Sequence, residues 1–460
     1  MPSHQLFAPA LAALGLATVG LVTAAAPREA VAAGETRIEE VTSPGGIEAY
    51  LISEPSIPFL SMAFQFKGGS TLDPESKEGL AYMVSGLLDE GAGELDSQAF
   101  RQELEDKAIR LSFDAGRDDF SGDLRTLNEH RDRAFELLRL ALTEPRFDQE
   151  PVERVRSQIL TSLARRSEDP DALASETWFQ AAFPDHPYGR PVRGTPESIT
   201  SLTVDDMRGF VDRRLAKDNL IVGVAGDITA EELGPLLDLA FGELPATSVA
   251  PDVGPGEFEG GETIVVRKSI PQSVVVFGHG GIARHDPDFY AAYVANHILG
   301  GGGFGSRLTE EVREKRGLAY GVYSYLYPND HAPLWMGGVG TNNLQVAESL
   351  DLIRHEIERM RAGEVTEEQL RDAKTYLTGS FPLRLTSNDQ IASMLAGIQR
   401  ENLGIDYLEK RNDYIEAVTL DDLKRAAGRL FDPEDLLVVV VGDPVGVQGV
   451  QGVLPPDGGA

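Results

Sequence analysis

Two stretches align without a gap, SLTVDDMRGFVDRRLAKDNLIVGVAGD at Ser201–Asp227 and AVTLDDLKRAAGRLFDPEDLLVVVVGD at Ala417–Asp443. In each, a threonine stands three residues before an aspartate and opens a run with helical spacing, which predicts a capped helix start. An aliphatic run closed by Gly-Asp follows, and this pattern predicts a buried strand that ends in a turn. Each stretch is therefore predicted to be a capped helix that leads into a buried strand.

The beginnings of the two halves repeat as well. Ser56-Ile57-Pro58, Phe64, Gly68 and Asp73-Pro74 recur at a constant offset as Ser269-Ile270-Pro271, Phe277, Gly281 and Asp286-Pro287. Repetition at both ends predicts an α+β fold of two homologous domains. We place these domains at residues 35–242 and 263–450, joined by a linker at 243–262 that is rich in Gly, Pro and Glu.

Residues 1–33 are predicted to be a signal peptide. The run from Leu6 to Ala26 carries no charge and is followed by small residues that suit cleavage. An uncleaved N-terminal anchor is the alternative, because the apolar run is long. Both readings predict export to the periplasm or cell envelope. The chain has no cysteine, so disulfides and thiolate zinc sites are excluded.

The net charge of −31 excludes two classes of partner. Nucleic acid and anionic membrane surfaces would both repel such a chain, so we expect no nucleic-acid partner and no membrane association other than through the alternative N-terminal anchor. High solubility explains the charge better than a specific attraction for basic peptides does.

The tetrapeptide GLAY occurs twice. Its first copy lies in EGLAYMVSGLLDEG, where apolar residues recur at helical spacing. Residues at i, i+3 and i+4 of a helix share a face, which is how H-x-x-E-H arranges two imidazoles and a glutamate around zinc. At that spacing this sequence has Tyr82, Ser85 and Gly86.

Three long motifs resemble the pitrilysin, insulinase and mitochondrial processing peptidase family of inverted-motif zinc peptidases. They are FKGGSTLDPESKEGLAY, FPDHPYGRPVRGTPESITSLT and LGGGGFGSRLTEEVREKRGLAYGVYS. The resemblance implies that each domain is a mainly antiparallel sheet packed with helices and that the two form half of a clamshell. It also implies that a downstream glutamate completes the zinc site, near residues 157–166, but SQILTSLARR contains no acid. We therefore expect no metal in this chain and no hydrolysis by the family mechanism in its first half.

The second GLAY ends at Tyr320, and Arg313 lies seven residues before it. This spacing resembles a pattern of the same family, in which an arginine is followed seven residues later by a tyrosine. The resemblance implies that Tyr320 donates a hydrogen bond to the oxyanion and that Arg313 holds the peptide backbone. The alternative is that both residues serve the fold, with Arg313 paired to Glu310 or Glu311.

The run LGGGGFGSRL satisfies the dinucleotide fingerprint G-x-G-x-x-G at Gly300, Gly302 and Gly305. A predicted helix precedes it where the fingerprint requires a strand, so nucleotide binding is set aside. The run resembles a shortened form of the glycine-rich loop in the non-catalytic subunit of the processing peptidase. That resemblance implies substrate contact by Gly301, Gly302, Gly303 and Phe304, and tight turning alone is an equally good explanation.

The histidines do not suggest a metal site elsewhere in the chain. His355-Glu356-x-x-Arg359 lacks the second imidazole of H-E-x-x-H and is interpreted as a solvated helix face. We expect His279, His285 and His297 to lie in loops or at the surface. For His186, a packing role is expected.

Together these features predict a non-zinc subunit of a heteromeric envelope peptidase, which stabilises the transition state and binds substrate for a homologous zinc-bearing partner. Zinc is then the partner's cofactor, and a peptide is the shared substrate. The alternative is a catalytically inactive homologue that binds peptides or scaffolds a complex. A self-sufficient enzyme with unrecognised ligands is the least favoured interpretation.

Overall fold

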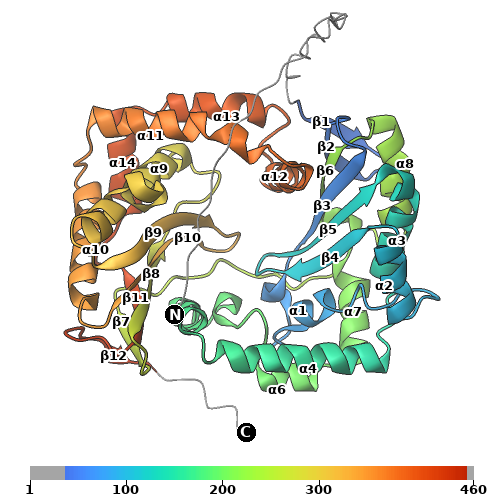
Figure 1. Ribbon diagram of the computed structural model, residues 1–460, viewed down its shortest axis with the longest axis horizontal. Helices are drawn as coiled ribbons and strands as arrows, with labels where there is room; N and C mark the ends of the chain where they lie inside the picture. The colour runs from blue at the N-terminus through green and yellow to red at the C-terminus, as the bar shows by residue number, and fades with distance from the viewer. Residues whose placement is uncertain (1–36, 453–460) are drawn as a thin grey trace, which may run out of the picture. The chain divides into compact units, whose positions relative to one another are not determined.

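The computed structural model describes residues 37–452, which belong to one compact unit (Figure 1). The predicted signal peptide, 1–33, lies outside the described residues. Within 37–452, no helix combines the length and apolar character that a bilayer crossing requires.

The N-terminal half builds a six-stranded sheet in the order β1-β2-β6-β3-β5-β4. Its strands are β1 (Glu39–Thr42), β2 (Glu48–Ser53), β3 (Phe59–Lys67), β4 (Arg110–Ala115), β5 (Asp119–Leu127) and β6 (Leu220–Gly226). Only β2 and β6 pair in parallel.

The C-terminal half repeats this arrangement over five strands, in the order β12-β7-β11-β8-β10-β9, with β12 in the edge position that β1 takes in the first sheet. Its strands are β7 (Thr263–Arg267), β8 (Gln272–Gly280), β9 (Ala319–Pro328), β10 (Pro333–Asn342), β11 (Leu437–Gly442) and β12 (Val450–Gln451). The parallel pairs are β7 with β11 and β7 with β12, and the other pairs are antiparallel. The predicted α+β fold of two homologous domains is confirmed.

A buried phenylalanine crosses a glycine on the neighbouring strand in both sheets. Phe64 lies opposite Gly122, and Phe277 lies opposite Gly337. A Cβ at Gly122 would lie 2.3 Å from the Phe64 ring, and a Cβ at Gly337 would lie 2.4 Å from the Phe277 ring. Glycine is required at both positions because the aromatic ring occupies the space of a side chain.

The predicted capped helices are confirmed as α7 (Val204–Arg214) and α14 (Leu420–Leu430). Thr203 and Thr419 each accept a hydrogen bond from the backbone of the aspartate three residues on, and that aspartate bonds back to the threonine. The helices then lead into β6 and β11, as predicted.

Helices cover one face of each sheet. The N-terminal core is closed mainly by α1 (Leu80–Ser85), α2 (Ser97–Asp106), α3 (Arg131–Thr143), α4 (Gln149–Arg166), α6 (Pro196–Ser201), α7 and α8 (Ala230–Phe241). The C-terminal core is closed mainly by α9 (Phe289–Asn296), α10 (Val346–Arg361), α11 (Glu367–Gly379), α13 (Tyr407–Glu416) and α14.

The opposite faces are covered by an exchange of two helices, which Figure 1 shows beside their sheets. Helix α5 (Pro170–Ala182) belongs to the N-terminal half but packs on β8 and β11 of the C-terminal sheet, while α12 (Asn388–Arg400) packs on β6 and β3 of the N-terminal sheet. Trp178 of α5 is fully buried and donates a hydrogen bond to the carbonyl of Leu437 over 3.1 Å. On the other side, Gly223 of β6 allows the α12 backbone to approach, because a Cβ there would lie 2.2 Å from the Ala392 carbonyl oxygen.

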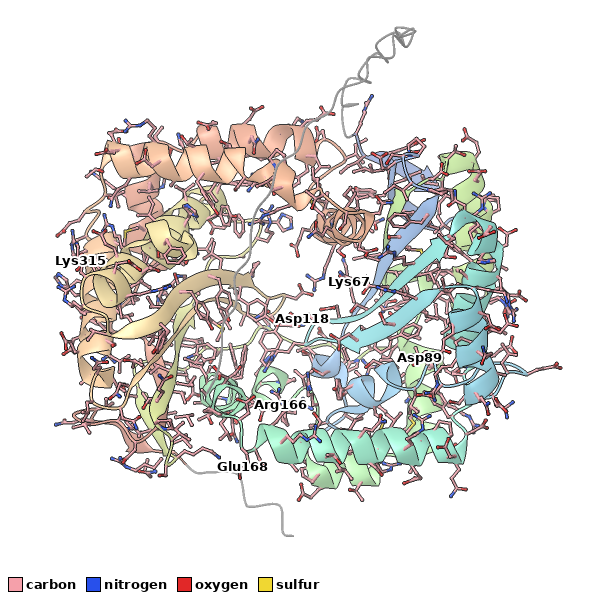
Figure 2. The ribbon with its side chains drawn as sticks, in the orientation of Figure 1. Lys67, Asp89, Asp118, Arg166, Glu168 and Lys315 are labelled. Atoms are coloured by element: carbon pink, nitrogen blue, oxygen red, sulfur yellow. The ribbon has the colours of Figure 1, made fainter. Side chains whose placement is uncertain are left out.

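A polar junction joins the hairpin β4–β5 to the hairpin β9–β10. The Asp118 carboxylate, labelled in Figure 2, accepts hydrogen bonds from the Tyr188 hydroxyl at 2.6 Å and from the Asp330 backbone at 3.1 Å. The His331 backbone donates to the Tyr188 hydroxyl at 3.0 Å, and Arg400 of α12 pairs with Asp330 at 2.9 Å. The two hairpin tips are therefore held together by buried and partly buried hydrogen bonds.

Residues 243–262 contain no helix or strand. The segment is nevertheless tied to both halves, because the Glu259 backbone donates to Ala182 and the Gly256 backbone donates to His331.

Removing the Trp178 ring should destabilise both halves, which should then still unfold together in one transition. Trp178→Ala leaves a large cavity between α5 and the C-terminal sheet and should lower the free energy of unfolding by about 3–5 kcal/mol. Denaturant unfolding followed by circular dichroism measures this loss, with Trp178→Phe as the milder control. Two separate unfolding transitions, of which only one responds to the substitution, would contradict the idea that the exchanged helices couple the two halves.

Candidate functional site

The three positions that correspond to the two histidines and the glutamate of H-x-x-E-H lie on or beside the short helix α1. The Tyr82 ring is partly buried against the N-terminal core, and the Arg193 guanidinium lies over it at 4.9 Å. The Ser85 hydroxyl donates to the carbonyl of Tyr82 over 2.9 Å. Gly86 ends the helix, so the helix is shorter than the apolar spacing through Leu88 suggested. Tyr82 and Ser85 are thus committed to packing and to the helix itself.

Helix α4 fills the space beside Gly86. A Cβ at Gly86 would lie 3.2 Å from Cγ1 of Val155 on α4, which is tighter than ordinary contact. The segment Ser157–Arg166, where the resemblance implies a third ligand, is the second half of this helix. Across residues 37–452, no cluster of three or more His, Cys, Asp or Glu side chains is placed to hold a metal. The donors at this position do not fit zinc.

A buried carboxyl group holds the start of α1. Asp73 accepts hydrogen bonds from the backbone of Gly79 at 3.1 Å and of Ala81 at 3.2 Å. Burial raises the pKa of Asp73 to about 7, although these hydrogen bonds and the charge of Arg214 act in the opposite direction. The group is therefore partly protonated at neutral pH.

Arg313 and Tyr320 lie on either side of a tight turn. Arg313 belongs to a π-helical segment, η7 (Thr309–Glu314), and Tyr320 is the second residue of β9. The Gly317 backbone donates to the Arg313 carbonyl over 2.8 Å, and the Leu318 backbone donates to Val312 over 2.9 Å. Gly317 has a positive φ of 64°, a conformation that favours glycine.

A β-bulge turns Tyr320 outward. Ala319 pairs with Thr341 and Gly321 pairs with Gly340, so Tyr320 has no partner in the register. Its side chain is 80 % exposed. Bulges re-aim side chains at sheet edges, and here the phenol is presented to the surroundings of the chain.

Arg313 lies against the glycine-rich loop. Its guanidinium sits 4.7 Å from the centre of the Phe304 ring, which is itself 73 % exposed. Its nearest acid is Glu314 at 3.4 Å, whereas Glu310 and Glu311 pair with Lys315. The structure thus brings Arg313 and Phe304 together, and the pairing of Arg313 with Glu310 or Glu311 that we considered is not formed.

The glycine-rich loop follows a helix. Because a dinucleotide fingerprint requires a strand before the loop, this position argues against nucleotide binding. Helix α9 continues into a π-helical turn, η5 (His297–Gly301), and a short 3-10 turn follows, η6 (Gly303–Gly305). A Cβ at Gly301 would lie 2.8 Å from Asn296, and one at Gly302 would lie 2.8 Å from the His297 carbonyl. Gly303 has a φ of 57°. These three glycines therefore have a conformational role, whatever else the loop contacts.

Three further tyrosines on β9 were missed by the sequence reasoning, although their two-residue spacing is a signal of one shared strand face. Tyr323 stacks on Tyr325 with ring centres 6.2 Å apart, and Tyr325 meets Tyr327 edge-on at the same distance. Burial raises the pKa of Tyr325 to about 12, so its hydroxyl stays neutral. β9 is an edge strand of the described sheet and carries this aromatic row beside Tyr320.

Two expectations about histidine and acidic residues were wrong. His279 lies in β8, is 1 % exposed and stacks on Trp335 at 4.8 Å, so it is a core residue whose burial lowers its pKa to about 4. Glu356 is 2 % exposed rather than solvated, and it pairs with Arg359 at 2.8 Å and with Arg307 at 3.9 Å. Both side chains lie on buried faces of their strand or helix, and the local sequence did not indicate this burial.

The packing role expected for His186 is confirmed. Its ring accepts a hydrogen bond from the Tyr188 backbone and meets the Tyr188 ring at 4.8 Å.

Two family profiles match the chain. Residues 49–196 match Insulinase (Peptidase family M16), and residues 201–377 match Peptidase M16 inactive domain. The Helicobacter pylori protein named Non-peptidase homolog YmxG is 32 % identical over 340 residues, which are 74 % of this chain and 78 % of that protein. An uncharacterized zinc protease of Streptomyces coelicolor is 27 % identical, over 88 % of this chain and 89 % of that protein.

The solved structures agree with this assignment. The crystal structure of a peptidase M16 inactive domain from Pseudomonas fluorescens has a TM-score of 0.83 and 26 % identity, over 90 % of this chain and 99 % of that one. The chain belongs to the peptidase M16 family. Within that family it is an inactive homologue, because its own zinc positions hold Tyr82, Ser85 and Gly86.

Rebuilding a histidine at the second ligand position should be resisted by α4. Gly86→His must displace Val155 and should lower the free energy of unfolding by about 1–3 kcal/mol, as overpacking does. Gly86→Ala is the control with a smaller expected loss, and adding Val155→Ala to Gly86→His should restore part of the stability. Thermal unfolding of the four proteins tests this, and an unchanged melting temperature for Gly86→His would contradict the described packing.

Asp73 should make stability depend on pH. Its pKa is raised from 3.8 to about 7 in the folded chain, so its contribution is complete below about pH 4 and is lost as the pH rises through 7. Asp73→Asn keeps an acceptor oxygen but does not titrate. The melting temperature of the natural chain, relative to that of Asp73→Asn, should therefore fall between pH 4 and pH 8. A constant difference across this range would show that the Asp73 pKa is not raised.

Proposed function

We propose that this chain is the non-zinc subunit of a heteromeric peptidase of the cell envelope, and that it supplies Tyr320 and Arg313 to a homologous zinc-bearing partner. The observation that carries the proposal is the contrast between the zinc positions of the N-terminal half and Tyr320 of the C-terminal half. The zinc positions are filled by packing residues, whereas Tyr320 is turned outward by a bulge and is 80 % exposed.

The chemistry of the two side chains suits this role. The Tyr320 hydroxyl forms no hydrogen bond with another residue of 37–452, so its proton is available to an oxyanion that develops on a peptide carbonyl. The Arg313 guanidinium is permanently charged and lies only 3.4 Å from one exposed acid, so its remaining donors are free for backbone carbonyls. Zinc and the attacking water would belong to the partner.

The glycine-rich loop supports substrate binding next to this pair. Phe304 is exposed and in contact with Arg313, so a peptide held by the guanidinium would also touch the Phe304 ring. We include Gly301, Gly302 and Gly303 as the turn that presents this ring. Export to the envelope, which rests on the predicted signal peptide, completes the proposal.

Tyr320→Phe tests the shared site. Loss of one oxyanion donor should lower kcat by roughly 100-fold with little change in KM, when the variant is combined with the zinc-bearing partner. Tyr323→Phe removes a hydroxyl from the same strand and should leave kcat unchanged. If Tyr320→Phe retains full activity, the chain does not contribute to catalysis, and the peptide-binding or scaffold role takes its place.

A further inference from the structure

The N-terminal sheet carries a pocket that the proposed catalytic role does not use. It has a volume of about 640 Å³ and opens beside α12, on the face of the sheet opposite to α1. Its floor is formed by β3, β4 and β5, and its wall is formed by the first turns of α12 with the short turn before it. Figure 1 shows α12 beside β6 and β3, and β5 is the next strand of that sheet after β3.

Three arginines line this pocket, although the chain as a whole carries a net charge of −31. They belong to Arg110, Arg125 and Arg384. Arg125 pairs with Asp389 at 3.3 Å, and the Ser61 hydroxyl also donates to that carboxylate. Neither Arg110 nor Arg384 has an ion pair or a side-chain hydrogen bond within residues 37–452.

Two of these arginines stand directly opposite each other. Arg110 of β4 is the register partner of Arg125 of β5. Like charges directly opposite in an antiparallel pair are destabilising, and the Asp389 carboxylate that pairs with Arg125 also accepts a hydrogen bond from Ser61. An anion in the pocket would offset this repulsion.

The other residues of the pocket define the kind of anion. Asp123 also lines it, and burial together with Asp389 and Asp114 raises the pKa of this carboxyl. Two acidic side chains repel a dianion such as phosphate more than a monoanion, while they accept hydrogen bonds from an adjacent amide N–H. Leu383 and Met394 add apolar surface for a neighbouring side chain.

We propose that this pocket binds a carboxylate of a peptide, with Arg110 and Arg384 as the groups that hold it. The free C-terminus of the peptide is the occupant that fits best, because it combines one negative charge, an amide donor and a side chain in one unit. The proposal rests on the proposed peptide-binding function and extends it by assigning a selectivity for the end of the substrate.

The equivalent place in the C-terminal sheet is chemically different, which argues against a purely structural origin of the charges. There β9 and β10 take the positions of β4 and β5, and α5 takes the position of α12. The side chains on that face of β9 are Tyr323, Tyr325 and Tyr327. The same scaffold therefore holds an aromatic row in one half and paired arginines in the other.

The test measures binding of N-terminally labelled nonapeptides of randomised sequence to the full mature chain by fluorescence anisotropy. The same pool is prepared with a free C-terminal carboxylate, with an amidated C-terminus, and amidated with one internal glutamate. The free acid should bind at least tenfold more tightly than the amide. Tight binding of the glutamate-containing amide would assign the carboxylate to a side chain and still support the pocket.

The variant Arg110→Gln/Arg384→Gln should lose the preference for the carboxylate, while Arg371→Gln, on the exposed face of α11, should keep it. All substituted side chains are exposed, so unchanged melting temperatures confirm that the variants fold. Equal binding of acid and amide by the natural chain, absence of binding, or a preference that survives in the double variant would overturn the proposal. The effect of Tyr320→Phe on cleavage is measured separately, so failure here leaves the catalytic proposal standing.

Discussion

The exchange of α5 and α12 is the constraint on which the rest of the structure depends. Each sheet has one face covered by helices of its own half, and an uncovered second face would expose rows of aliphatic side chains to water. Helix α5 covers β8 and β11, and α12 covers β3 and β6. Because each half completes the core of the other, the two repeats cannot separate without exposing apolar surface. The hydrogen bonds around Asp118 then fix the hairpin tips that lie between them.

Two copies of one scaffold have taken different chemical roles. In the N-terminal half, the helix that would carry zinc ligands presents Tyr82, Ser85 and Gly86, and α4 packs Val155 against it. In the C-terminal half, the strand at the sheet edge presents Tyr320 through a bulge, next to Arg313 and Phe304. Within residues 37–452, the chain therefore keeps groups suited to binding and to charge stabilisation, and no cluster of side chains there is placed to hold a metal.

Much of this fold could be predicted from the sequence because the signals are local. The capping threonines, the aliphatic strands before Gly-Asp and the constant offset of the repeat each follow from short-range patterns. The resemblance of three motifs gave the family, which the comparisons then showed.

The remainder depends on contacts between residues far apart in sequence. An amphipathic pattern in α5 or α12 shows that a helix has a buried face, but it does not say which sheet will cover that face. His279 and Glu356 were misjudged for the same reason, since their burial comes from Trp335 and Arg307. The outward turn of Tyr320 follows from a register shift with β10, and the arginine pocket joins strands and a helix from opposite ends of the chain.

We propose above all that this chain completes the active site of another one. This proposal is tested most directly by isolating the mature chain from its own cells under native conditions and determining the sequence, stoichiometry and zinc content of whatever accompanies it. The account predicts an M16 relative with an intact H-x-x-E-H motif, in roughly equal amount and with about one zinc ion per pair. Isolation of the chain alone and without zinc would contradict the claim.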